Sequence, residues 1–126
     1  MRAKLLPCLA VTLALTLGAS PALAQDEVSR RGSCSGGPSE WRLRVERESS
    51  TSLRVRFEIE HGEPDQVWQL FLSDNGTRIY AGSKVSDGGG EVGVRKLTTD
   101  RDGRDRVKAT GVNLATGESC AGVIRY

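Results

Sequence analysis

Histidine, carboxylate and serine side chains are the groups in this sequence that could do chemistry, and the single histidine comes first. His61 stands in EIEHGEPDQ with Glu60, Glu63 and Asp65, a set that could bind a metal ion or titrate near neutral pH. A metal site normally needs further histidine or cysteine ligands, and this stretch has the glycine, proline and aspartate content of a turn. We therefore expect a connecting loop and no metal site here.

Three aspartates surround Gly103 in TTDRDGRDRV. Asp100, Asp102 and Asp105 resemble the oxygen ligands that recur on alternate residues of calcium loops before a glycine turn. An EF-hand loop ends with a glutamate at its twelfth position and lies between helices, whereas that position counted from Asp100 is Gly111, in a stretch that predicts a strand. The arginines between the aspartates would repel a cation. We expect an ordinary turn, and the sequence leaves calcium binding open.

Nucleophilic catalysis would need a base beside a serine, and no G-x-S-x-G motif is present. Lys84 lies between Ser83 and Ser86, but neighbours along a strand point to opposite faces, so Ser83 and Lys84 cannot face each other in a regular strand. The sequence therefore predicts a protein that is not an enzyme and that needs no cofactor.

The N-terminus has the pattern of a secretory signal peptide. Arg2 and Lys4 precede an apolar stretch over residues 5–17, and Ala22 and Ala24 form the small-x-small site that signal peptidase reads. The apolar stretch is shorter than the roughly 20 residues that span a membrane. We expect a signal peptide over residues 1–24, cleavage after Ala24, a secreted product and no stable membrane anchor after cleavage.

Cleavage would also change the charge balance, because the leader holds two of the cations and no acidic residue. The formal net charge of +2 would fall to zero in the mature chain. Global charge then gives no argument for nucleic acid or for an anionic membrane as a partner.

Cysteine content predicts one disulfide. Cys8 lies inside the apolar leader without the small residues expected before a lipid-bearing cysteine, so we expect it to be removed with the leader. Cys34 and Cys120 remain, and an even cysteine count in an exported chain is typical of a disulfide framework. We expect a Cys34–Cys120 bridge that ties the two ends of the domain together; a free thiol or an intermolecular bridge is the alternative.

The elements that must position these residues are strands. Strict alternation of apolar and charged residues in EWRLRVERE (40–48) and LRVRFEIE (53–60) predicts half-buried antiparallel strands. A register that opposes Arg44 to Glu58 and Glu46 to Arg56 would pair opposite charges along the outer face, whereas a shift of two would oppose Arg44 to Arg56. We expect the first register.

Five more strands follow over residues 66–73, 78–85, 91–97, 106–114 and 119–126. Asn75 and Gly76 predict a two-residue hairpin between the third and fourth strands, and with Thr77 they form a glycosylation sequon whose use the sequence leaves open. Residues 25–38 are polar and rich in glycine and serine, and we expect a flexible N-terminal segment there. Trp41 and Trp68 alternate with polar residues, which favours a place in the core.

Seven strands with turns at this spacing, over residues 39–126, resemble an immunoglobulin-like or fibronectin type III-like β-sandwich. Trp68 in the third strand matches the buried tryptophan of immunoglobulin domains. The cysteines depart from that pattern, because Cys34 precedes the first strand and Cys120 lies in the last. The resemblance implies an all-β antiparallel fold and no particular function.

These features favour a secreted, non-catalytic β-sandwich module that binds an extracellular protein or a cell-surface glycan. We expect its site on the face of the third, fourth and sixth predicted strands, with the loops over residues 61–65 and 98–105. A cluster of Phe71, Tyr80 and Tyr126 on one sheet face would mark a protein-binding patch. The alternative is a protease inhibitor that acts through an exposed loop within RGSCSGGP (31–38), near Cys34. The sequence leaves the ligand and the oligomeric state open.

Overall fold

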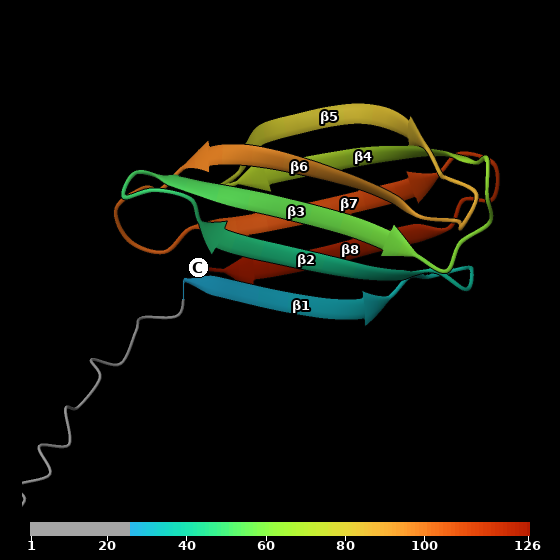
Figure 1. Ribbon diagram of the computed structural model, residues 1–126, viewed down its shortest axis with the longest axis horizontal. Coiled ribbons are helices and arrows are strands. Elements are labelled where there is room, and N and C mark those ends of the chain that lie inside the picture. The colour runs from blue at the N-terminus through green and yellow to red at the C-terminus, as the bar shows by residue number, and fades with distance from the viewer. Residues whose placement is uncertain (1–25) are drawn as a thin grey trace, which may run out of the picture.

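The computed structural model describes residues 26–126, which form eight antiparallel strands and no helix. The strands are β1 (Glu27–Ser33), β2 (Glu40–Arg47), β3 (Ser52–Glu60), β4 (Val67–Asp74), β5 (Thr77–Val85), β6 (Val92–Thr99), β7 (Arg106–Asn113) and β8 (Ser119–Arg125). They lie in two four-stranded sheets, β1-β2-β3-β6 and β5-β4-β7-β8, which overlap face to face, one in front of the other in Figure 1. The described range contains no helix that could cross a membrane. The predicted all-β, antiparallel, sandwich-like architecture is confirmed.

The core lies between the two sheets and follows from the period-two pattern of their strands. In β3 every second residue is fully buried, and the same alternation holds through β4 and β7. Trp68 is 0% exposed, as expected for a core residue. The other fully buried apolar side chains are Leu43, Val45, Leu53, Val55, Phe57, Ile59, Leu70, Leu72, Val107, Ala109 and Ile124.

The prediction of seven strands is wrong, because the structure has eight. The additional strand, β1, lies within the segment that we expected to be flexible, and it pairs with β2 from Glu27–Glu46 to Ser33–Glu40. Its side chains are mostly exposed, so its sequence has no alternation of apolar and polar residues that would predict a strand. Backbone hydrogen bonds to the free edge of β2 hold this strand, and such bonds do not depend on side-chain type.

The register predicted for the first long hairpin is also wrong. The structure opposes Arg44 to Arg56 and Glu40 to Glu60, the arrangement with like charges across from each other. The turn explains this: the backbone N–H groups of Glu48 and Ser49 both donate to the carbonyl of Ser52, which closes a short loop between β2 and β3. Loop length fixes hairpin register, whereas each charge pair is worth only a few tenths of a kcal/mol.

Asn75, Gly76 and Trp41, which we expected in a turn and in the core, are further sequence features that the structure tests. Asn75 and Gly76 have φ angles of 49° and 82° and connect β4 to β5 as a two-residue turn, so the hairpin prediction is confirmed. Trp41 is only half-buried, and its ring covers Gly122 of β8 and Gly32 of β1, closing one side of the sandwich. The predicted signal peptide, residues 1–24, and the predicted cleavage after Ala24 lie outside the described residues.

Candidate functional site

The two sheets present outer faces of very different chemistry. The outer face of β1-β2-β3-β6 carries both arginine and glutamate, most densely along β2 and β3. The outward positions of β4, β5, β7 and β8 hold no aspartate or glutamate, and we call this surface the carboxylate-free face. Its residues are Val67, Gln69, Phe71, Ser73, Arg78, Ala81, Ser83, Val85, Arg106, Lys108, Thr110, Val112, Leu114, Ser119, Ala121, Val123 and Arg125.

One end of the carboxylate-free face is apolar. Val67 is paired with Val85 on β5, and on its other side the Leu114 N–H donates to the Val67 carbonyl at 2.9 Å. The three residues therefore form one row across adjacent chain segments. Val67 is 39% exposed, Val85 is 60% exposed and Leu114 is 57% exposed. A contiguous apolar row in water is a common feature of docking surfaces.

The other end of this face is cationic. Arg78, Arg106, Lys108 and Arg125 lie on neighbouring strands toward the Asn75 turn. A shallow hollow of about 200 Å³ lies among Phe71, Arg78, Lys108 and Thr110, and the guanidinium of Arg78 sits 4.6 Å from the centroid of the Phe71 ring. A hollow lined by an aromatic ring and two cations can accept an acidic side chain together with an apolar one.

The three aromatics that we expected to cluster are not together. Phe71 lies on the carboxylate-free face, and Tyr80 opposes the fully buried Leu72 and packs against the core. Tyr126 lies under Arg47, and its hydroxyl donates to the carbonyl of Asp26 at 3.1 Å. Only Phe71 therefore contributes to this surface.

His61 lies in an exposed loop, as expected. Its side chain is 67% exposed and its nearest acidic partner is Glu40, with 3.7 Å between Nε2 and Oε2. His61 has a φ of 62°, in the left-handed region, which fits a tight connection between β3 and β4. Within residues 26–126 no three histidine, cysteine, aspartate or glutamate side chains form a group that could hold a metal ion.

The three aspartates around Gly103, where we expected an ordinary turn, have different environments in the structure. Asp102 is exposed, Asp105 is 1% exposed, and Asp100 accepts a hydrogen bond from Arg47 at 2.7 Å. The hydrogen bond from Arg47 lowers the pKa of Asp100. Burial, then a hydrogen bond with Asp100 and the charge of Asp74, raises the pKa of Asp105 to about 6.

Asp74 is a partner of Asp105 that sequence reasoning missed. It ends β4, is 1% exposed and accepts a hydrogen bond from Thr98 at 2.9 Å. Asp105 accepts one from the side-chain amide of Asn75 at 3.2 Å, so that amide, the one a sugar would modify, is already engaged. One oxygen of each aspartate is buried without a hydrogen-bond partner among the described residues. Nothing in the sequence signals that these two carboxylates meet.

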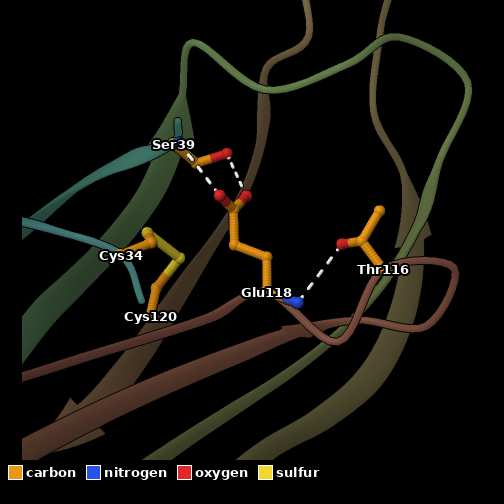
Figure 2. Close-up of a disulfide and its surroundings, with 5 residues drawn as sticks. All are labelled: Cys34, Ser39, Thr116, Glu118 and Cys120. Carbon is orange, nitrogen blue, oxygen red and sulfur yellow. Dashed lines mark hydrogen bonds between the residues drawn. A yellow bond between two sulfur atoms is a disulfide. The ribbon is translucent and has the colours of Figure 1, made fainter. Parts of the chain in front are cut away.

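The disulfide lies at the opposite end of the molecule. Cys34 and Cys120 are joined with 4.4 Å between their Cα atoms, across 86 positions of sequence. Beside them the Glu118 carboxylate, 3% exposed, accepts hydrogen bonds from the backbone N–H and the hydroxyl of Ser39, and its own N–H donates to Thr116 (Figure 2). These hydrogen bonds hold the 34–39 loop against the last hairpin. Both oxygens of the carboxylate already accept a hydrogen bond from Ser39.

The serine–lysine pair also lacks a catalytic arrangement. Ser83 is paired with Gln69 on the outer face, and Lys84 opposes the buried Trp68, so the two point to opposite sides of β5. Ser86 is 2% exposed, and its hydroxyl donates a hydrogen bond to the Glu63 carbonyl at 2.7 Å.

Comparison with models of known protein families, with curated proteins and with solved structures gives no match.

Proposed function

We propose that this protein is an exported, non-catalytic binding module that docks a protein partner through the carboxylate-free face. The single observation that carries the proposal is the exclusion of carboxylates from that face, while sixteen acidic residues are present in the chain. An ordinary solvated sheet face mixes both signs of charge, as the opposite sheet does. The disulfide supports the export part of the proposal, because such bonds persist in oxidising compartments.

The charge pattern favours a partner that is acidic at one end of its contact and apolar at the other. Arg78, Arg106, Lys108 and Arg125 would meet its carboxylates, and the row of Val67, Val85 and Leu114 would bury its apolar side chains. A second copy of this chain fits poorly, because a two-fold contact is self-complementary and this face brings only cations to it.

We also propose that the sandwich is of the fibronectin type III-like kind, with β1 added at one edge. Without β1 the sheets are β2-β3-β6 and β5-β4-β7-β8. In immunoglobulin constant domains the fourth strand lies in the sheet of the first strand. Here the fourth strand, counted from β2, is β5, and it pairs with β4 in the other sheet.

The protease-inhibitor alternative finds no favouring observation in the loop near the disulfide. An inhibitory loop has to offer an extended stretch of backbone to a protease cleft. Residues 35–38 are exposed, but Gly36 has a φ of 82° and Ser35 is already paired with Ser119. Gly37 packs against the Glu118 side chain so closely that a Cβ there would have no room.

A pair of charge insertions tests the proposed docking face. Val85→Glu places a carboxylate in the apolar row, whereas Leu97→Glu makes the same change at a leucine that is 55% exposed on the other sheet. Partners captured from extracellular material by the wild type would be identified, and their affinities measured by surface plasmon resonance. We expect Val85→Glu to weaken binding at least tenfold, about 1.4 kcal/mol, and Leu97→Glu to leave it unchanged.

Two results would contradict the proposal. The first is a partner that tolerates Val85→Glu but is lost with Leu97→Glu, which would place the contact on the other sheet. The second is binding that both variants retain at wild-type strength.

A further inference from the structure

The charged sheet places arginines directly opposite one another across three strands. Arg44 of β2 opposes Arg56 of β3, and Arg56 opposes Arg95 of β6. The next row of outward residues, two positions further along the strands, also runs across the sheet. It contains Arg31, Arg42 and Glu58 and ends at Gly93. We call the arginines of these two rows the arginine band: Arg31, Arg42, Arg44, Arg56 and Arg95.

The glutamates on this sheet neutralise the band only in part. Glu27 lies 3.0 Å from Arg44, and Glu58 lies 3.7 Å from the Nε atom of Arg56, beyond hydrogen-bond distance. Within residues 26–126 no carboxylate lies within ion-pair distance of Arg42 or Arg95. The Nε atoms of Arg42 and Arg56 are buried and have no hydrogen-bond partner in that range. Guanidinium donors covered by protein and left without acceptors are costly unless a ligand supplies acceptors.

A hollow adjoins the band where it meets the edge of the sheet. Its volume is about 350 Å³, and its lining includes Arg56, Arg95, Glu58 and Lys84, the last from β5 of the other sheet. Gly93 has no side chain to fill the space between Arg95 and Glu58. Three cations from two sheets therefore converge on one open volume, against one carboxylate.

The surroundings of the band limit the shape of a ligand. Glu27 and Glu46 lie with Arg54 in the row on one side, and Glu40 and Glu60 lie in the row on the other. The positive region is thus two rows deep, about 7 Å along the strands, and it extends across four strands at about 4.8 Å spacing. A flat anionic membrane or a nucleic acid duplex would also meet the glutamates of the two flanking rows, whereas a narrow chain that runs across the strands would not.

We propose that the arginine band and the hollow beside Gly93 bind a multivalent oxyanion carried on a narrow chain, namely a sulfated polysaccharide. The planar fork of arginine matches the oxygen geometry of sulfate and binds it through paired hydrogen bonds. Successive arginines across the strands would engage successive sulfate groups, and Glu58 would compete with the ligand for Arg56. This site lies on the sheet opposite the proposed docking face, and neither proposal depends on the other.

Isothermal titration with size-fractionated dextran sulfate oligosaccharides tests the inference, with unsulfated dextran and inorganic sulfate as the matched probes. We expect saturable binding of the sulfated oligosaccharide that weakens with added salt, and no binding of dextran. Arg95→Ala should weaken binding about tenfold, and Glu58→Gln should strengthen it severalfold, because the competing carboxylate is removed. Arg104→Ala, which removes an exposed loop arginine, should have no effect.

Thermal unfolding of each variant verifies that the fold is intact, and Arg95→Lys, which keeps the charge without the fork, should fall between wild type and Arg95→Ala. The proposal is overturned if the sulfated oligosaccharide does not bind, or if Arg95→Ala and Arg104→Ala weaken it equally. It is also overturned if unsulfated dextran binds as well, or if inorganic sulfate alone binds as tightly as the oligosaccharide.

Discussion

Asp105 and Asp74 are the residues whose chemistry departs most from that of a solvated aspartate. Both are 1% exposed, and each keeps one buried oxygen without a hydrogen-bond partner among the described residues. Burial is the main reason that the pKa of Asp105 is raised to about 6, and the neighbouring Asp100 and the charge of Asp74 add to it. Asp105 thus makes the stability of the folded protein depend on pH.

The sign of that dependence follows from the two pKa values of Asp105. In the unfolded chain the aspartate pKa is about 3.9, and in the folded protein it is about 6. Between these pH values the folded protein keeps a proton that the unfolded chain has lost. The stability from this group is therefore complete below about pH 4 and is lost as the pH rises through 6. Asp100, whose pKa is lowered by Arg47, acts in the opposite direction and loses its contribution on acidification.

Asp105→Asn should therefore stabilise the protein at pH 7 by about 1–2 kcal/mol and change it little at pH 4. Asparagine can still accept the hydrogen bond from Asn75, and it carries no charge to bury. Urea denaturation at one-unit steps from pH 4 to pH 8 measures the difference. Asp102→Asn, at an exposed position in the same loop, is the control and should shift stability by less than about 0.5 kcal/mol. A difference that stays constant over the whole pH range would contradict the assignment.

For single residues, the sequence predicts conformations that depend only on neighbouring residues. Asn75 and Gly76 could be placed in a turn because both tolerate positive φ, and that requirement involves no distant residue. The same reasoning could not find the buried acid pair, because Asp74 and Asp105 meet only when β4 pairs with β7. The pattern around Gly103 suggested ordinary exposed turn residues, and burial of Asp105 depends on contacts far along the chain.

Among the elements, β1 and β8 depend on Trp41 to close their side of the sandwich. The Trp41 ring lies against two glycines, and a Cβ on Gly122 would come within 2.5 Å of its Cζ3 atom. Glycine is therefore needed on β8 because the tryptophan ring occupies the space of a side chain.

Gly122→Ala should destabilise the protein by about 1–3 kcal/mol, because either Trp41 or β8 has to move. Gly88→Ala is the matched control, since a Cβ there has no atom within 4 Å, and it should change stability by less than about 0.5 kcal/mol. Urea denaturation monitored by tryptophan fluorescence compares the two. Equal stability of both variants would show that the strand and the ring shift without cost.

The strands show where alternation is sufficient and where it is not. It located β2 and β3, because burial of one face leaves a period of two in the sequence, whereas β5 was found from the hairpin signal that precedes it. It missed β1, whose side chains are mostly exposed. It also could not fix the register of β2 against β3, since a slip of two residues keeps the same face buried and only the turn decides.

At the scale of the whole molecule, cationic and acidic residues are nearly equal in number, but they are distributed unequally between the two outer faces. Pairing of β4 with β5 and β7 brings the outward residues of separate strands, none of them acidic, onto one surface. No single strand carries that information, so the sequence could name the face to inspect but not its lack of carboxylates. The arginine band is hidden in the same way, because it depends on the register that charge pairing predicted wrongly.

The disulfide acts at this same scale, because Cys34 and Cys120 close a loop over 86 positions. Reduction, or replacement of both cysteines by serine, should lower the free energy of unfolding by about 2–5 kcal/mol. Thermal unfolding with and without a reductant measures this, and the double serine variant should be insensitive to the reductant. An unchanged melting temperature on reduction of the wild type would contradict the expected contribution.

The Cys34–Cys120 disulfide also affects what happens when a protease cuts the chain. Almost every connection between strands lies inside the loop that the two sulfur atoms close. A protease that nicks the exposed 101–104 stretch would leave two fragments that the disulfide still joins, so they would migrate as one band on a non-reducing denaturing gel. The cut chain would stay assembled with both outer faces in place, so a backbone break there need not end its ability to bind.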